Sequence, residues 1–202
     1  MNSQTEKYIL SVPYFSQKDG VVKLFYGDRG CGIVSLKMVI DYFSGKNSGW
    51  DFLKNATDKT RAFNGNMWTH DGLIGIARIA GMGAYRIDYN KTLLWKTIMP
   101  FFLLLKGASL RELLWFMKSC LVATTGGIKK DIKRLLDLKI PLIVSLSPSF
   151  SADLESSHLA VLVGYGEDCF IIYDPWNFGS DYEISSDEFF KIWTKRAVIV
   201  FP

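Results

Sequence analysis

The sequence lacks the features of several protein classes. It has three cysteines in 202 residues and no CxxC pair, so neither a disulfide framework nor a zinc knuckle is indicated. No block of five or more Lys/Arg occurs and the net charge is only +4, so we expect no nucleic-acid partner. The glycine-rich stretch 27–32 matches neither a dinucleotide fingerprint nor a phosphate loop. We therefore expect no cofactor and no metal site.

Long apolar runs are also missing. Residues 1–8 are polar and lack the apolar core of a secretory signal. The most apolar window, residues 97–105, is broken by Pro100 and followed by Lys106, which leaves it too short to span a membrane. The sequence thus predicts a protein of a reducing compartment, located in the cytoplasm and without a membrane span.

The chain does have a large apolar fraction, and its secondary-structure patterns divide into two parts. Hydrophobic residues make up 49% of the chain and aromatic residues 14%, which is enough for one substantial core. Helical patterns fill residues 1–139, and short strand patterns follow in residues 140–202. This order predicts a single α+β domain, with an N-terminal helical lobe packed on a C-terminal antiparallel sheet lobe.

The individual elements follow from spacing and turn residues. Strands are predicted over 142–146, 158–165, 170–173, 181–184 and 197–201, after an extended piece at 9–15. Helices are predicted over 31–43, 51–59, 69–80, 128–138 and 187–193. Residues 21–29 are interpreted as a loop. The apolar segment 92–120 predicts two helices, which are buried in the helical lobe or form a lid or a partner-binding surface.

Cys31 is the candidate nucleophile. It stands between Gly30 and Gly32 at the start of a predicted buried helix, where free backbone N–H groups and the helix dipole favour thiolate over thiol. We expect the flanking glycines to leave its sulfur open to another molecule. The alternative is a structural cysteine that packs as a small apolar side chain, the role we assign to Cys120 and Cys169.

His158 and Asp174 are the candidate base and its orienting carboxylate. Each lies eight residues from Gly166, so a hairpin centred on that glycine would place them directly opposite each other. A carboxylate beside an imidazole fixes the tautomer of a catalytic histidine and stabilises its charged form. If this pairing is wrong, Asp153 or Asp168 becomes the candidate carboxylate.

Three further polar or aromatic residues have weaker assignments. Gln17 precedes Cys31 by fourteen residues, and its side-chain amide is the candidate oxyanion donor together with the Cys31 backbone N–H. His70 begins a predicted helix beside Asp71, and we interpret it as a local polar contact. Trp176 either shields the His–Asp pair from water or packs under the sheet.

The order of these motifs resembles the stand-alone relatives of the bacteriocin-processing cysteine peptidases, a papain-like group that trims double-glycine leader peptides. The matching pieces span almost the whole chain: residues 12–17, 30–32, 141–146, 158–165 and 173–176. The resemblance implies a papain-like α+β fold and a peptide or protein substrate. It also implies the roles proposed above for Gln17, Cys31, His158 and Asp174.

The sequence therefore predicts a cysteine peptidase, or a related amide-bond hydrolase, that needs no cofactor. Two alternatives stay open. A thiol acyltransferase would use the same residues, with an amine or a thiol in place of water. A non-catalytic peptide-binding module would use the same cleft without turnover.

Overall fold

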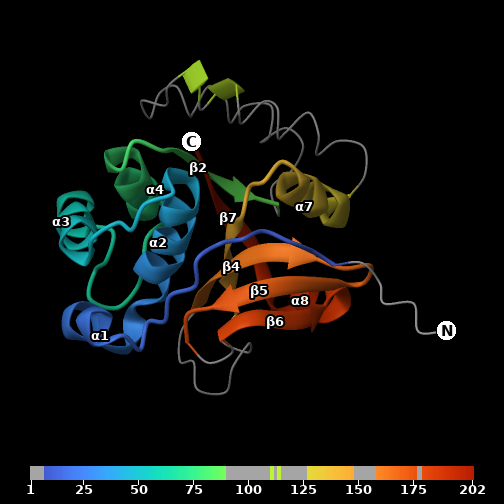
Figure 1. Cartoon of the computed structure of the whole chain (residues 1–202), viewed down its shortest axis with the longest axis horizontal. Helices are drawn as coiled ribbons and strands as arrows, with labels where there is room; N and C mark the ends of the chain where they lie inside the picture. Colours follow the sequence, from blue (N-terminus) through green and yellow to red (C-terminus); the bar gives the residue numbers. More distant parts are fainter. Residues whose placement is uncertain (1–6, 90–109, 112, 115–126, 148–157, 177–178) are drawn as a thin grey trace.

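The fold places a seven-stranded antiparallel sheet beside a group of helices (Figure 1). In this computed structural model the described residues are 7–89, 110–111, 113–114, 127–147, 158–176 and 179–202. The helices are α1 (Gly20–Tyr26), α2 (Cys31–Ser44), α3 (Trp50–Thr60), α4 (His70–Ile79), α7 (Ile128–Asp137) and α8 (Ser186–Ile192), with a 3-10 turn at Gly27–Arg29. The strands are β1 (Tyr8–Ile9), β2 (Gly83–Asp88), β3 (Leu142–Leu146), β4 (His158–Tyr165), β5 (Cys169–Asp174), β6 (Gly179–Ser185) and β7 (Trp193–Phe201).

The sheet has the strand order β2-β7-β3-β4-β5-β6, and β1 pairs with β4 outside this path. Every residue of β3 is buried, as expected for a central strand that is covered on both faces. Helix α2 packs on β4, α4 on β2, and α8 on β5. The core therefore lies between the helices and the sheet, and the α+β class predicted from the sequence is confirmed.

Helix α2 forms the centre of the helical part. It is buried on nearly all sides, because Ile33, Leu36 and Ile40 share one face while Val34 and Met38 fill another. It ends at the predicted place, since Gly45 takes a left-handed conformation with φ of 63° that glycine adopts at no steric cost.

The C-terminal half of α2 holds a buried ion pair. Lys37 Nζ lies 2.7 Å from Asp41 Oδ2, and it also donates to Asn47 Oδ1 and to the Ser48 carbonyl. Its ammonium further lies over the ring of Phe15. Because each polar atom of the pair is bonded, the burial of these charges is compensated, and the helix is held against its neighbours.

The prediction of a loop over residues 21–29 is wrong. Helix α1 begins after Asp19, whose side chain accepts a hydrogen bond from the Val21 N–H. Val22 and Tyr26, four residues apart, form its buried side. Two buried residues in a seven-residue helix leave only a weak periodic signal among the polar ones.

Most other predicted elements are confirmed within a few residues. Thr69 caps α4 through a bond from Gly72 N–H, and Ser185 caps α8 through a bond from Glu188 N–H. Strand β2 was not predicted, although it pairs along its whole length with β7. The helices expected over 92–120 lie outside the described residues, apart from four helical positions at 110–111 and 113–114.

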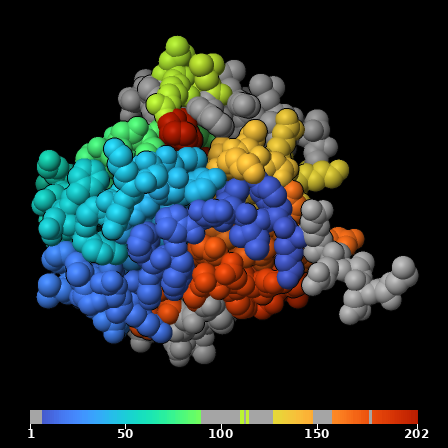
Figure 2. All heavy atoms as spheres, in the orientation of Figure 1, coloured from blue at the N-terminus to red at the C-terminus, as the bar shows by residue number. Residues whose placement is uncertain are grey.

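The N-terminal stretch runs across the sheet toward the helices, as the blue segment over the orange strands in Figure 2 shows. Tyr8 pairs with Tyr165 and Ile9 with Gly164, and Leu10 N–H donates to the Val163 carbonyl. Leu10 and Val12 are buried beneath this crossing. In the part of the chain that is described, no helix has the length and apolar character needed to cross a membrane.

Candidate active site

Cys31 is the first residue of α2, with Gly30 as its N-cap. The first backbone N–H groups of a helix have no partner within the helix, so the thiol sits where negative charge is favoured. Only 8% of the residue is exposed. Ser35, one turn further along α2, donates from Oγ to the Leu159 carbonyl and thereby fixes this helix against the strand of His158.

The two glycines beside Cys31 have a different role from the one expected. A side chain at Gly30 would overlap Val22, and one at Gly32 would overlap the indole ring of Trp68. Trp68 is itself held by a hydrogen bond of 2.5 Å from Nε1 to the Arg29 carbonyl. The glycines therefore allow close packing around the start of α2 and do not simply open a path to the sulfur.

His158 and Asp174 are brought together as predicted. His158 opens β4 and Asp174 ends β5, and the distance from His158 Nε2 to Asp174 Oδ1 is 2.5 Å. The same oxygen accepts a hydrogen bond of 3.0 Å from the Trp176 backbone N–H. Both side chains are almost fully buried, so the contact is shielded from water.

The predicted strand register that led to this pair is wrong. Leu162 pairs with Ile172 and Val161 with Tyr173, a register that places Asp174 opposite Ala160. The cause is the turn, which is closed by the Gly166 N–H and the Cys169 carbonyl and is therefore centred beyond Gly166. An irregularity between Leu162 and Gly164 then shifts the register by one residue. His158 and Asp174 are therefore diagonal neighbours on one face, close enough for their side chains to meet.

The pKa of His158 is raised from 6.5 to about 9. Burial is the largest single influence and acts to lower it, but hydrogen bonds to Asp174 and Cys31 and the charges of both groups together outweigh burial. Since Nε2 faces Asp174, Nδ1 is the ring nitrogen available to the thiol. This arrangement favours an imidazolium beside the sulfur.

Gln17 lies next to the start of α2. It is 1% exposed, and its Nε2 donates to the Asp28 carbonyl at 2.7 Å, while Oε1 is buried and has no hydrogen-bond partner among the described residues. The amide nitrogen carries two hydrogens, so one donor remains beyond the bond to Asp28. The Gln17 backbone N–H donates to the Pro175 carbonyl at 2.9 Å, which ties this loop to the segment that follows Asp174.

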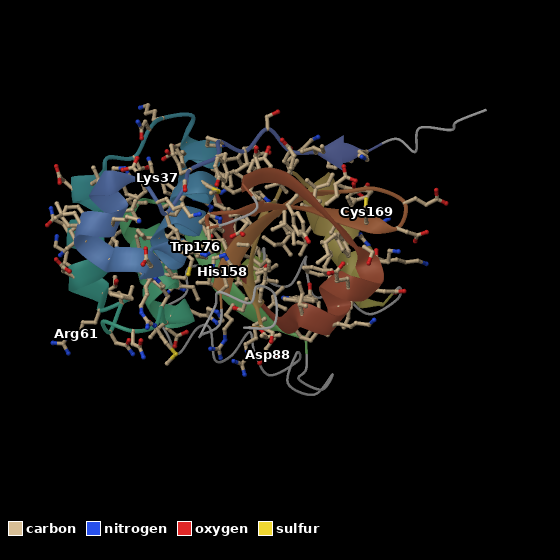
Figure 3. All side chains as sticks on the ribbon, turned by 90° about the horizontal axis from the view of Figure 1, so that it is seen from below. Lys37, Arg61, Asp88, His158, Cys169 and Trp176 are labelled. Atoms are coloured by element: carbon tan, nitrogen blue, oxygen red, sulfur yellow. The ribbon has the colours of Figure 1, made fainter. Side chains whose placement is uncertain are left out.

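A small cavity of about 90 Å³ adjoins the pair, and Cys31, His158, Arg29, Trp68, His70 and Ser145 are among its lining residues. In Figure 3, His158 lies between the helices and the sheet, whereas Cys169 lies at the far end of the sheet. Among the described residues, no cluster of His, Cys, Asp and Glu could hold a metal ion.

His70 makes a polar contact, but not the local one that was expected. Its Nε2 lies 2.8 Å from Ser145 Oγ, on a strand 75 positions later in the chain. It also lines the cavity that contains Cys31. No sequence signal near His70 pointed to this partner, because the contact depends on how α4 packs over the sheet.

A helix-borne cysteine facing a strand-borne histidine, across the junction of a helical part and an antiparallel sheet, is the arrangement of papain-like cysteine peptidases. Solved structures share this fold. A double-glycine motif protease from an AMS/PCAT transporter, in complex with its leader peptide, has 19% identity and a TM-score of 0.53, with 96% of this chain and 94% of that chain covered. The peptidase domain of Streptococcus ComA has 17% identity and a TM-score of 0.53, with coverages of 96% and 98%.

A C39-like peptidase from Bacillus anthracis has 15% identity and a TM-score of 0.57, with 98% of both chains covered. The profile of the Peptidase_C39 like family matches residues 9–94 and 117–198. The chain belongs to this family of cysteine peptidases, and the predicted family resemblance is confirmed. Among curated proteins, none matches the chain significantly.

Proposed function

We propose that the chain hydrolyses peptide bonds with Cys31 as nucleophile, His158 as acid and base, Asp174 as the group that orients His158, and Gln17 as oxyanion donor. The observation that carries this proposal is the 2.5 Å contact between His158 and Asp174, beside a cavity that His158 shares with Cys31. Peptidase chemistry needs these groups together, because a thiolate attacks and a positioned acid releases the amine.

The reaction runs in two steps. Cys31 Sγ, as thiolate, attacks the substrate carbonyl, and the resulting oxyanion accepts hydrogen bonds from the Cys31 backbone N–H and the Gln17 amide. The imidazolium of His158 gives its proton to the leaving amine, and a thioester remains on Cys31. His158 then takes a proton from water, which attacks the thioester and releases the acid and the free thiolate.

The site and the family support a substrate with small residues at the cleaved bond. The cavity beside Cys31 is small, and the indole of Trp68 forms part of its wall. A small residue at the cleaved bond fits such a site, and the transporter protease of similar fold is described as a double-glycine motif protease. A free thiol at Cys31 suits a cytoplasmic, reducing location.

Active-site labelling tests the proposal. At about pH 6.5, iodoacetamide is expected to alkylate Cys31 before Cys120 and Cys169, because the imidazole of His158 lies beside the Cys31 thiol. Equal labelling of all three thiols would contradict it. A Cys169→Ala variant should label and turn over like the wild type, which controls for a cysteine distant from the site.

Cleavage of model peptides is the second test of the proposed function. Peptides with Gly-Gly, Ala-Ala or Leu-Leu at the scissile bond are incubated with the protein, and the products are identified by mass spectrometry. We expect a free carboxylic acid as product, the Gly-Gly peptide as the best substrate, and no turnover by Cys31→Ala. A product joined to an added amine would instead identify an acyltransferase, and an unreactive but peptide-binding wild type would identify a binding module.

A further inference from the structure

A second cavity adjoins the one at Cys31. It has a volume of about 230 Å³, compared with about 90 Å³ for the first, so it is the larger of the two. The two share a wall formed by Met67, Trp68, His70 and Ser145. On its far side lie Asn64, Thr69, Thr194 and Arg196. The hollow at the nucleophile thus continues along the sheet to a polar compartment, which we call the Arg196 cavity.

The shared wall is built from fixed groups. Ser145 is buried on β3, beside Leu159 of β4, and its Oγ lies 2.8 Å from His70 Nε2. Thr194 Oγ1 donates to the Ser145 carbonyl at 3.0 Å, which links β7 to the same wall. Hydrogen bonds between three separate elements hold the wall in place, and a preformed wall is what a binding site requires.

The charge of the Arg196 cavity comes from arginine and not from histidine. The pKa of His70 is lowered to about 4, first by burial and then by the nearby Arg86 and Arg196, so His70 is neutral at neutral pH. The carboxylates Asp71 and Asp88 act in the opposite direction and are outweighed. At neutral pH the imidazole therefore offers hydrogen bonding without adding charge.

Arg196 is the cationic group that a ligand can reach. Its side chain is 55% exposed, and its Nε lies 3.6 Å from Asp88 Oδ2, which is longer than an ordinary hydrogen bond. Among the described residues, Asp88 is the ion-pair partner of Arg196. A guanidinium carries five N–H donors in a planar fork, so donors remain that match the two oxygens of a carboxylate.

We propose that the Arg196 cavity is a specificity subsite that binds an acidic side chain of the peptide substrate close to the cleaved bond. This inference rests on the proposed peptidase function, since it assigns a subsite to that same substrate. Met67 and Trp68 supply apolar surface for the methylene part of the side chain, and Arg196 supplies the counter-charge for its carboxylate. A basic side chain is disfavoured there, because Arg196 repels it.

Peptide binding without turnover tests the subsite. The full chain carrying Cys31→Ala is used to select binders from a random peptide library, and each selected sequence is then synthesised with Glu or Gln at its acidic position. Fluorescence anisotropy measures the two dissociation constants. We expect the Glu peptide to bind about fivefold more tightly, as for a partly exposed ion pair.

Matched variants on the same background assign the effect to one side chain. Arg196→Gln should remove the preference for Glu, Arg196→Lys should keep part of it, and Arg196→Glu should reverse it toward Lys. Lys191→Gln is the control, because Lys191 is exposed on α8 and lines neither cavity. Thermal unfolding of each variant checks that the fold is unchanged.

The outcomes separate this inference from the peptidase function. No peptide binding, no preference for Glu over Gln, or a preference that survives Arg196→Gln would each overturn the subsite. A wild type that binds acidic peptides in this way but neither labels at Cys31 nor cleaves any peptide would overturn the peptidase proposal and leave the subsite standing. Cleavage without a preference for Glu would overturn the subsite and leave the peptidase proposal standing.

Discussion

Burial disfavours the charged form of the His158 imidazole, whereas two partners, Asp174 and Cys31, favour it. Asp174 is the partner that the structure fixes most firmly, through His158 Nε2 at 2.5 Å and the Trp176 backbone N–H at 3.0 Å. A carboxylate held from two directions cannot easily turn away from the ring. This geometry supports the role proposed for Asp174 in orienting His158.

Substitutions of this pair should follow a fixed ranking. Asp174→Asn keeps a hydrogen bond but loses the charge, so its loss of kcat/KM should be the smallest. Asp174→Ala should cost more, because the ring loses its orienting partner. His158→Ala should cost the most, about 10²–10⁴-fold, because proton transfer is lost. Steady-state kinetics measures the order, and full activity of Asp174→Ala beside an inactive His158→Ala would show that Asp174 does not orient the base.

The pH profile of activity reports the raised pKa of His158. Its imidazolium persists up to about pH 9, so kcat/KM should fall on the alkaline side with a midpoint near that value. The same group contributes stability that is fully present below pH 6.5, the unfolded value, and is lost as the pH rises through about 9.

Asp174→Asn is the matching variant for this profile. It removes one of the groups that raise the pKa, so both the kinetic midpoint and the loss of stability should move to lower pH. Rates and unfolding curves measured from about pH 6 to pH 10 check this expectation. An alkaline midpoint that does not respond to Asp174→Asn would assign the titration to another group.

At the scale of elements, the start of α2 depends on the absence of a side chain at position 32. Gly32→Ala would push a methyl group into Trp68, whose indole is tied to the Arg29 carbonyl. We expect a loss of about 1–3 kcal/mol in the free energy of unfolding, together with reduced activity, because the start of the helix must move.

Chemical denaturation of two further variants isolates this cause. Gly20→Ala places the same methyl group in open space at the start of α1, so it should leave stability within about 0.5 kcal/mol. Adding Trp68→Ala to Gly32→Ala removes the overlap. The double variant should therefore lose less than the sum of the two single changes, and simple additivity would argue against a clash.

Strong local patterns were sufficient to predict many elements. The strands β3 and β4 were predicted with the observed bounds, because their apolar runs end at turn residues. Helix α1 was missed because its start depends on one capping contact of Asp19, and β2 because its partner β7 lies more than 100 residues away. Local sequence contains the signals for caps and periodicity, but not for pairings made by the tertiary fold.

The candidate site, too, could be predicted only where local sequence contains the signal. The residues Cys31, His158 and Asp174 could be selected from their local settings and their order. The turn is centred beyond Gly166 and the irregularity near Gly164 shifts the pairing by one residue, so Asp174 lies opposite Ala160 and not opposite His158. The His158–Asp174 contact forms because diagonal neighbours also meet. The wall made by His70 and Ser145 could not be predicted, since it arises where α4 meets the sheet.

At the scale of the whole molecule, the N-terminal stretch joins the two halves. Leu10 lies against β4 and is 3% exposed, whereas its neighbour Ile9 is 43% exposed. Leu10→Ala should lower the free energy of unfolding by about 2–5 kcal/mol, because it leaves a cavity in the core. Ile9→Ala is the control and should cost less than about 1 kcal/mol. Equal effects in urea unfolding would show that the crossing does not contribute to the core.

The position of β7 within the sheet has a consequence for the newly made chain. This strand spans Trp193–Phe201, is made after every other described strand, and lies between β2 and β3. On the ribosome, β2 and β3 therefore have no strand between them until residue 201 has left the exit tunnel. The sheet that carries His158 cannot close before that moment. The strand that completes the sheet is thus the last of the described strands to be made, so the order of translation delays the complete fold.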